Sequence, residues 1–196
     1  MPSSTPASSF EARGSIRRVA LLQSINLGQH RKLPMADLKV ALAAAGHTNI
    51  ATVLQTGNVL FDAPAAVTND ALETRIRTEI SDAFSMDVPT LVRDAAEWRA
   101  VVEHDPFREL DPHLSRYVVV FCAEPPGDRV ATALEGVDLE DDRWAVRGRE
   151  IYVFCPNGQI QSPVLQRLGR PKSSDTSSGP ATVRTWGTVL RIEAKL

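Results

Sequence analysis

The sequence predicts an α+β protein with two ferredoxin-like (βαββαβ) halves, antiparallel sheets and a C-terminal helix. The first observation is an order of apolar patterns, strand, helix, strand, strand, helix and strand, which occupies residues 16–94 and is the order of a ferredoxin-like unit. The second is that this order begins again at residue 116 in a shorter form. The third is a hydrophobic content of 43% in 196 residues, enough for a sizeable core.

The first half begins with a nearly continuous apolar run over 18–25, typical of a central strand. Pro34 then favours the start of a helix, apolar residues follow at helical spacing, and Gly46 ends it. Two strands, 50–55 and 58–62, form a hairpin. This segment therefore supplies the first three strands of a sheet.

A second amphipathic helix places Leu72, Ile76 and Ile80 on one face and precedes a short strand over 88–93. A connector helix is expected over 95–103. The second half then repeats the order in its own segments. They are a strand at 116–122, a helix around 129–134, a hairpin of 142–147 and 150–154, and a short helix around 163–168.

The residues between these elements define the expected organisation of the chain. Ser, Pro and Gly dominate the start and the segment near residue 175, and such compositions do not bury enough apolar area to order themselves. We expect a disordered leader at 1–15, an N-terminal half at 16–94, a connector helix and loop at 95–115, a C-terminal half at 116–169, a flexible loop at 170–181 and a C-terminal helix at 182–196.

Charge and composition exclude several functional classes. The 22 basic and 24 acidic residues give a net charge of -2, so no global basic field attracts nucleic acid or a membrane surface. No apolar run reaches the roughly 20 residues of a membrane span, and the first residues lack a secretory signal. Cys122 and Cys155 follow strand-like runs and are expected to be structural thiols. We expect a cytoplasmic protein without a metal or cofactor.

Two polar loops form the best candidate site. In a ferredoxin-like unit the first and second strands run parallel, so the loop after one and the turn after the other emerge at the same end. Their amides could then hold a polar ligand. The alternative is that these residues only satisfy loop backbone groups and permit turns. The candidate ligand-binding residues are Asn26, Gly28, Gln55, Thr56 and Asn58.

A basic run precedes the helix that begins at Pro34, and it is the second element of this site. His30, Arg31 and Lys32 lie where the free N–H groups of a helix start would favour an anion. His30 is the preferred catalytic acid or base, since it shares the loop with Asn26. The other candidates for proton transfer are His47, His104, His113, Asp37 and Asp105. A short basic run can also be simple solvated surface.

Several motifs in order make the chain similar to a known family. They read LLQSINLG, LPMADLK, QTGNVLF, RLG and ATVRTWGTVL, and they resemble domain-of-unknown-function family 1697. The resemblance implies a bacterial protein with a two-part α+β fold of ferredoxin-like halves, and it implies no activity. Where the family has Arg-Gly and Asn-Pro-Phe, this chain has Gln23-Ser24 and Asp105-Pro106-Phe107. Such changes in charge indicate a ligand different from that of the typical member.

The motif near the end of the chain adds two candidates. Arg184 and Trp186, expected in the last helix, could close over a ligand by ion pairing and stacking. The alternative for Trp186 is a hydrophobic anchor of that helix.

Three functional interpretations remain open at this point. The first is a protein that binds a small molecule, such as an anion, or a cofactor-independent enzyme of specialised metabolism. The second is RNA binding on a ferredoxin-like sheet, for which the central strand segments 19–22 and 59–61 of the first half supply only Phe61 as an aromatic residue. The third is a noncatalytic assembly module.

Overall fold

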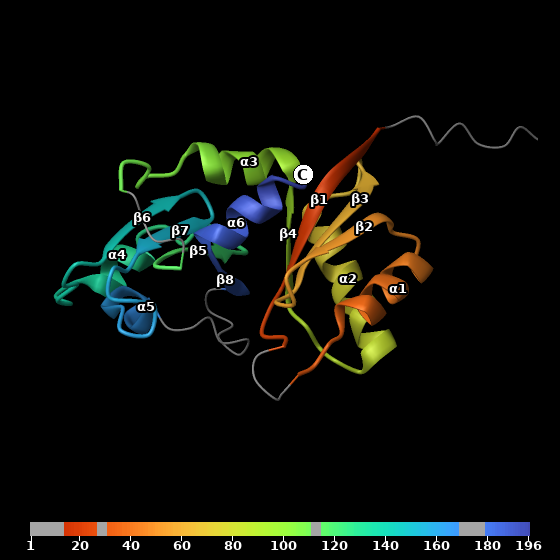
Figure 1. The fold of residues 1–196 in the computed structure, drawn as a ribbon, viewed down its shortest axis with the longest axis horizontal. Coiled ribbons are helices and arrows are strands. Elements are labelled where there is room, and N and C mark those ends of the chain that lie inside the picture. Colours follow the sequence, from red (N-terminus) through yellow and green to blue (C-terminus); the bar gives the residue numbers. More distant parts are fainter. Residues whose placement is uncertain (1–13, 27–30, 111–114, 169–178) are drawn as a thin grey trace, which may run out of the picture.

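The computed structural model describes residues 14–26, 31–110, 115–168 and 179–196. Its strands form two four-stranded antiparallel sheets, one in each half of the chain (Figure 1). The predicted fold class is confirmed, because each half has the ferredoxin-like order of elements and a helix ends the chain. Almost all of the predicted leader, and residues 170–178 of the predicted loop, lie outside the described residues.

In the N-terminal sheet the strand order is β2-β3-β1-β4, and each neighbouring pair is antiparallel. β1 and β2 therefore run in the same direction on either side of β3, and their carboxyl ends lie at the same end of the sheet. The elements of this half are β1 (Ser15–Leu22), α1 (Met35–Ala44), β2 (Thr48–Val53), β3 (Asn58–Pro64), α2 (Asn69–Phe84) and β4 (Thr90–Asp94).

Helices α1 and α2 cover one face of this sheet, because each carries an apolar stripe at helical spacing. α1 begins directly after Pro34, as predicted, and buries Met35, Leu38 and Leu42. α2 begins after Thr68, whose hydroxyl accepts a hydrogen bond from a backbone N–H of the first turn. These helices hold the sheet from one side and leave its loop ends accessible.

The turn between β2 and β3 depends on one glycine. Gly57 has φ +80°, and a Cβ at this position would lie 2.8 Å from Cβ of Leu22 and 2.9 Å from Cδ1 of Ile25. The backbone of Gly57 therefore lies against the end of β1, and its carbonyl oxygen accepts a hydrogen bond from Leu22 N–H at 2.8 Å. The close approach of the turn to β1 requires a residue without a side chain.

The C-terminal half has the strand order β6-β7-β5-β8, which is the order of the first half repeated. All its neighbouring strands are antiparallel. The helix α3 (Ala95–Glu103) connects the two halves. The remaining elements are β5 (Tyr117–Cys122), α4 (Arg129–Leu134), β6 (Arg143–Arg147), β7 (Glu150–Phe154), α5 (Pro163–Leu168), β8 (Ala181–Thr185) and α6 (Trp186–Glu193).

The end of the chain differs from the expected helix at 182–196. Residues 181–185 form strand β8, which pairs with β5, and the helix begins only at Trp186. Val183 stands three residues before Trp186, so the helical spacing of apolar residues continues into the strand. The second half is therefore a full ferredoxin-like unit with a fourth strand, not a shorter copy.

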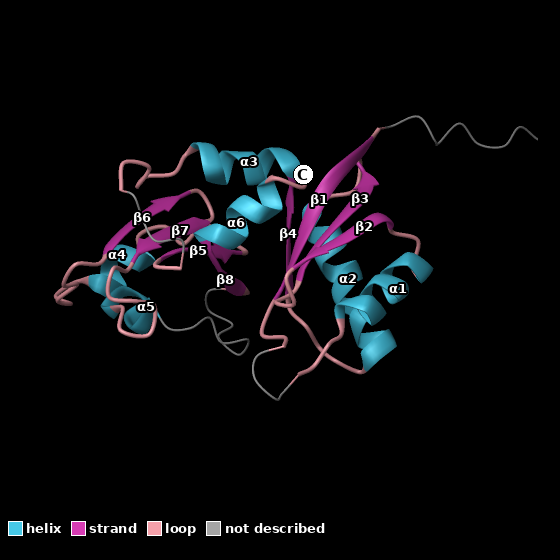
Figure 2. Cartoon of the chain, viewed as in Figure 1, coloured by secondary structure: helices cyan, strands magenta, loops and turns pink. Residues whose placement is uncertain are grey.

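A central core lies between the two sheets and includes side chains of both halves. It contains Trp98 of α3, stacked on Phe121 of β5 with ring centroids 5.0 Å apart, and the apolar face of α6. Figure 2 shows α3 and α6 between the two sheets. The outer face of the C-terminal sheet packs against α4 and α5. Among the described residues, each sheet is thus covered on both faces, and Phe61 is fully buried.

Candidate functional site

The structure brings the loop after β1 and the turn after β2 together, at the carboxyl ends of these strands. The side-chain amide of Asn26 donates from Nδ2 to the carbonyl oxygen of Gln55 at 2.7 Å. We call this end of the N-terminal sheet, made of residues 22–26, 31–34 and 54–58, the loop end. Gly28 and His30 lie outside the described residues.

The amide of Asn26 is occupied by contacts within the loop end. In addition to Gln55, Nδ2 donates to the carbonyl oxygen of Leu33 at 2.9 Å, and Oδ1 accepts from Leu33 N–H at 2.7 Å. Asn26 has φ +54°, a conformation that asparagine adopts more readily than most residues. Its side chain therefore ties the loop to the turn and gives the loop end its shape.

Asn58 lies beneath the turn and is completely buried. Its Nδ2 donates to the carbonyl oxygen of Val53 at 2.8 Å and to Oγ1 of Thr56 at 3.3 Å. Its Oδ1 accepts a hydrogen bond from Nε of Arg184 at 2.5 Å. The link between Asn58 and Arg184 joins residues 126 positions apart in the sequence.

Arg184 extends from β8 of the second half into the loop end of the first. Its two Nη atoms donate to Oγ1 of Thr182 at 2.6 Å and to the carbonyl oxygens of Val183 at 2.9 Å, Leu22 at 2.9 Å and Gly57 at 3.3 Å. With the bond to Asn58, all five guanidinium N–H groups have acceptors. Each acceptor is neutral.

No carboxylate among the described residues pairs with Arg184. The side chain is only 7% exposed, and burial lowers the pKa of its guanidinium to about 10. At neutral pH the group is still charged. The loop end therefore contains a buried positive charge. Neutral hydrogen-bond acceptors surround this charge, and no anion among the described residues neutralises it.

The exposed groups of the loop end are those that a ligand could reach. Arg31 and Lys32 are exposed, as are Gln55 and Thr56 of the turn. Arg31 donates from Nη2 to the carbonyl oxygen of Asp87 at 2.6 Å, and its remaining N–H groups have no described acceptor. The start of α1 has no side-chain cap, so its N–H dipoles add to the positive potential.

Trp186 does not lie among the exposed groups of the loop end. It is 7% exposed and stacks on Tyr117 in the central core, with ring centroids 4.8 Å apart.

The candidates for proton transfer are also dispersed. Nε2 of His47 lies 2.7 Å from Oε2 of Glu79, in a buried contact between the end of α1 and α2. His113 lies outside the described residues.

The two cysteines are buried and unpaired with one another. Burial is the main cause that raises the pKa of both thiols to about 11, so the thiolate is a small fraction at neutral pH. This environment is that of structural thiols.

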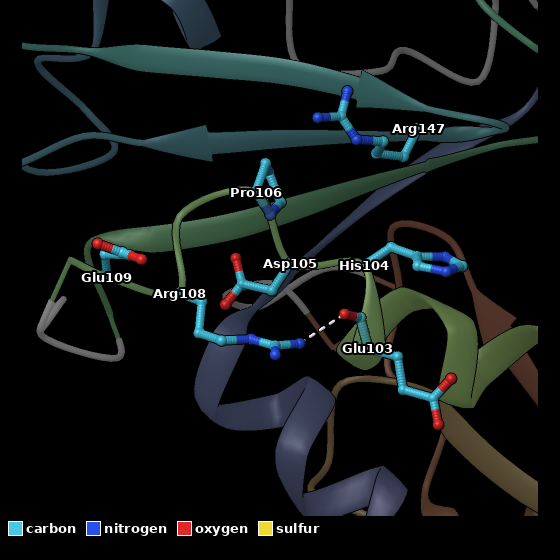
Figure 3. Close-up of a pocket in the computed structure, with 7 residues that line it drawn as sticks. All are labelled: Glu103, His104, Asp105, Pro106, Arg108, Glu109 and Arg147. Atoms are coloured by element: carbon cyan, nitrogen blue, oxygen red, sulfur yellow. Dashed lines mark hydrogen bonds between the residues drawn. The ribbon is translucent and has the colours of Figure 1, made fainter.

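A second polar region lies where α3 ends, and its geometry was not expected from the sequence. It is a shallow depression of about 680 Å³ between the loop after α3 and the end of β6. Figure 3 shows Asp105 and Arg108 on that loop and Arg147 across from them. We call it the α3 depression. Its lining residues are Glu103, His104, Asp105, Pro106, Arg108, Glu109 and Arg147.

Asp105 belongs to a small, partly buried hydrogen-bond network. Its Oδ1 accepts hydrogen bonds from the hydroxyl of Tyr117 at 2.5 Å and from Phe107 N–H at 2.8 Å. Burial and the hydrogen bond to Asp105 raise the pKa of Tyr117, which keeps the phenol protonated as a donor. From the sequence, Asp105 is a candidate for proton transfer, but its contact with Tyr117 is not predicted, because that contact depends on how α3 meets β5.

The described residues lack two further features. None of the helices has the length and apolar character needed to cross a membrane. No group of three or more His, Cys, Asp and Glu side chains is arranged to hold a metal ion.

Comparisons with known proteins agree with the fold. Residues 16–152 match the family described as "Protein of unknown function (DUF1697)". Among solved structures, a conserved bacterial protein from Streptococcus pneumoniae is similar, with a TM-score of 0.71 and 18% sequence identity over 92% of this chain and 98% of that chain. No curated protein matches the sequence. At this identity the structural similarity supports the fold alone.

Proposed function

Because the chain belongs to the DUF1697 family, whose description assigns no function, its role has to be inferred from its geometry, and we propose that it binds a small anionic molecule at the loop end. The observation that supports this proposal is the buried charge of Arg184, which has five neutral acceptors and no carboxylate among the described residues. A buried cation without a counterion is costly, and a bound anion nearby would lower that cost.

The exposed cations supply the direct contacts in this proposal. Arg31 and Lys32 would approach the anion from the loop, with the hydroxyl of Thr56 and the amide of Gln55 on the other side. Asn26 and Asn58 would act as positioning residues, since their amides are held by contacts within the protein. The proposal concerns binding, and no reaction is assigned to the site.

RNA binding has less support from the same structure. A ferredoxin-like RNA platform needs an exposed sheet face with aromatic residues for base stacking. The described sheets are covered on both faces, and the aromatic residues of their central strands are buried except Phe154, which is half-buried against the central core. An assembly function has no specific support either, because the strongly exposed apolar side chains, such as Val40 and Ile160, lie on separate elements.

Thermal unfolding with small anions tests the proposal. At constant ionic strength, phosphate, oxalate and citrate are compared with chloride, since a ligand that binds only the folded state raises Tm by mass action. We expect at least one of these anions to raise Tm, and Arg31→Gln combined with Lys32→Gln to abolish the effect. The matched control combines Arg191→Gln with Lys195→Gln, two exposed cations of α6 and the chain end.

Two results would contradict the proposal. One is a Tm that stays at the chloride value with every anion of the panel. The other is an anion effect of equal size in the loop variant and in the control variant, because this would show that the anion acts on the protein surface in general.

A further inference from the structure

The α3 depression carries charges of both signs that do not pair with each other. Asp105 contributes a carboxylate, as do Glu103 and Glu109 among the lining residues, and Arg108 and Arg147 contribute guanidinium groups. None of these groups forms an ion pair with any described residue. Opposite charges that share a depression and stay unpaired are suited to a ligand that places its own charges between them.

The carboxylate of Asp105 is held in a defined orientation. The hydroxyl of Tyr117 and the N–H of Phe107 both donate to Oδ1, and Tyr117 is itself stacked in the central core. No described residue donates to the second oxygen, Oδ2, and Asp105 lines the depression. Oδ2 is therefore a carboxylate acceptor in a fixed position. Such an acceptor can bind an ammonium group.

The two guanidinium groups keep donors available. Arg108 donates from Nη2 to the carbonyl oxygen of Glu103 at 2.5 Å, and Arg147 donates from Nη1 to the carbonyl oxygen of Val146 at 3.0 Å. The other N–H groups of both side chains have no described acceptor. Figure 3 shows the carboxylate of Glu103 turned away from Asp105. The free N–H groups can form paired hydrogen bonds with a carboxylate or phosphate.

We propose that the α3 depression binds a small zwitterion, a molecule with an ammonium group for Asp105 and an acid group for Arg108 and Arg147. The depression is shallow and open to solvent, so its charged groups, rather than enclosure, would hold the ligand. This site is separate from the loop end, and the inference does not depend on the function proposed there. Pro106 provides an apolar wall for the carbon chain between the two charged groups.

Binding of ω-amino acids tests this inference and measures the spacing of the two charges. Glycine, 4-aminobutyrate and 6-aminohexanoate are titrated into the labelled full-length protein and followed by NMR. Acetate, hexanoate and hexylamine serve as probes with one charge. We expect one zwitterion to bind at least about tenfold more tightly than any singly charged probe, as expected when two charge-assisted contacts replace one.

Substitutions identify the groups responsible. Asp105→Asn keeps an acceptor for Tyr117 and Phe107 and removes the charge, so the fold is retained while zwitterion affinity should fall about tenfold. Arg147→Gln should have a similar effect. Arg143→Gln, on the same strand but outside the lining residues, is the matched control and should bind like the wild type.

The inference is overturned by any of three results. No zwitterion binds at concentrations up to about 10 mM. Singly charged probes bind as tightly as zwitterions. Asp105→Asn, with its fold confirmed by the NMR spectrum, binds the zwitterions as the wild type does.

Discussion

Replacement of Asn26 by alanine tests the structural role of the loop end most directly. The substitution removes three hydrogen bonds, two with Leu33 and one with Gln55. At about 1 kcal/mol for each bond, the loss amounts to about 3 kcal/mol. Asn26 also has φ +54°. Alanine in this left-handed conformation adds about 1 kcal/mol, so the free energy of unfolding should fall by about 4 kcal/mol.

Asn49 provides a matched control, because it shares the backbone conformation without the network. It has φ +51° and is exposed, and its side chain donates one hydrogen bond, to Asp62 at 3.1 Å. Asn49→Ala should therefore cost about 1 kcal/mol, mostly from the backbone. Asn26→Asp keeps the acceptor for Leu33 N–H and loses both donated bonds, so its cost should be intermediate.

Urea unfolding followed by tryptophan fluorescence measures these differences, since Trp98 and Trp186 are buried in the central core. The free energy of unfolding should differ by about 3 kcal/mol between Asn26→Ala and Asn49→Ala, which corresponds to the three hydrogen bonds of Asn26. A difference below about 0.5 kcal/mol would refute the reasoning, because the amide of Asn26 would then contribute no more than an exposed side chain.

Three further predictions concern the core and the junction of the halves. Gly57→Ala should lower the free energy of unfolding by about 3 kcal/mol or more, because φ is positive there and a Cβ would clash with β1. Gly127→Ala, where φ is also positive but no atom lies within 4 Å of the added Cβ, should lower it by about 1 kcal/mol. Chemical unfolding of both variants measures the difference. Because burial raises the pKa of Cys122 and Cys155 from 9.0 to about 11, the folded state keeps protons that the unfolded chain releases. The free energy of unfolding should therefore fall as pH rises through this window, and less so in a double cysteine-to-alanine variant, as urea titrations at several pH values would show. In Arg184→Lys, an ammonium group with three donors replaces a guanidinium that uses five. Urea unfolding should show a free energy of unfolding lower by about 2–4 kcal/mol, and an unchanged value would count against the hydrogen-bond network of Arg184.

Local patterns were sufficient to predict most of the fold. α3, α4, β7 and α5 have the predicted bounds, because their apolar spacing and their flanking turn residues agree. β8 was not recognised. Its residues, ATVRT, alternate apolar and polar side chains, but Val183 also continues the helical spacing of Trp186 and Val189, and this spacing predicts a helix. Only its pairing with β5 shows that it is a strand.

The candidate site was predictable in position but not in its bonding. The convergence of the two loops follows from strand directions, which the order of elements determines, and the contact between Asn26 and Gln55 agrees with it. The saturation of the amides of Asn26 and Asn58 depends on distances that no local pattern contains. The partner of Asn58 is Arg184, and the partner of Asp105 is Tyr117, and neither pairing is visible before the halves are assembled.

The bonding of Arg184 indicates that the two halves form one folding unit. Its acceptors Leu22, Gly57 and Asn58 belong to the first half, and the guanidinium belongs to the second. The inner face of the N-terminal sheet is also apolar and is covered by α3 and α6. A fragment of residues 14–94 would expose that face and leave the buried Oδ1 of Asn58 without its donor, so we expect it to be aggregated or unfolded, whereas the whole chain unfolds in one transition. A monomeric fragment with well-dispersed NMR signals would show instead that the first half is stable without the second, and that the contacts of Arg184 form between two folded domains.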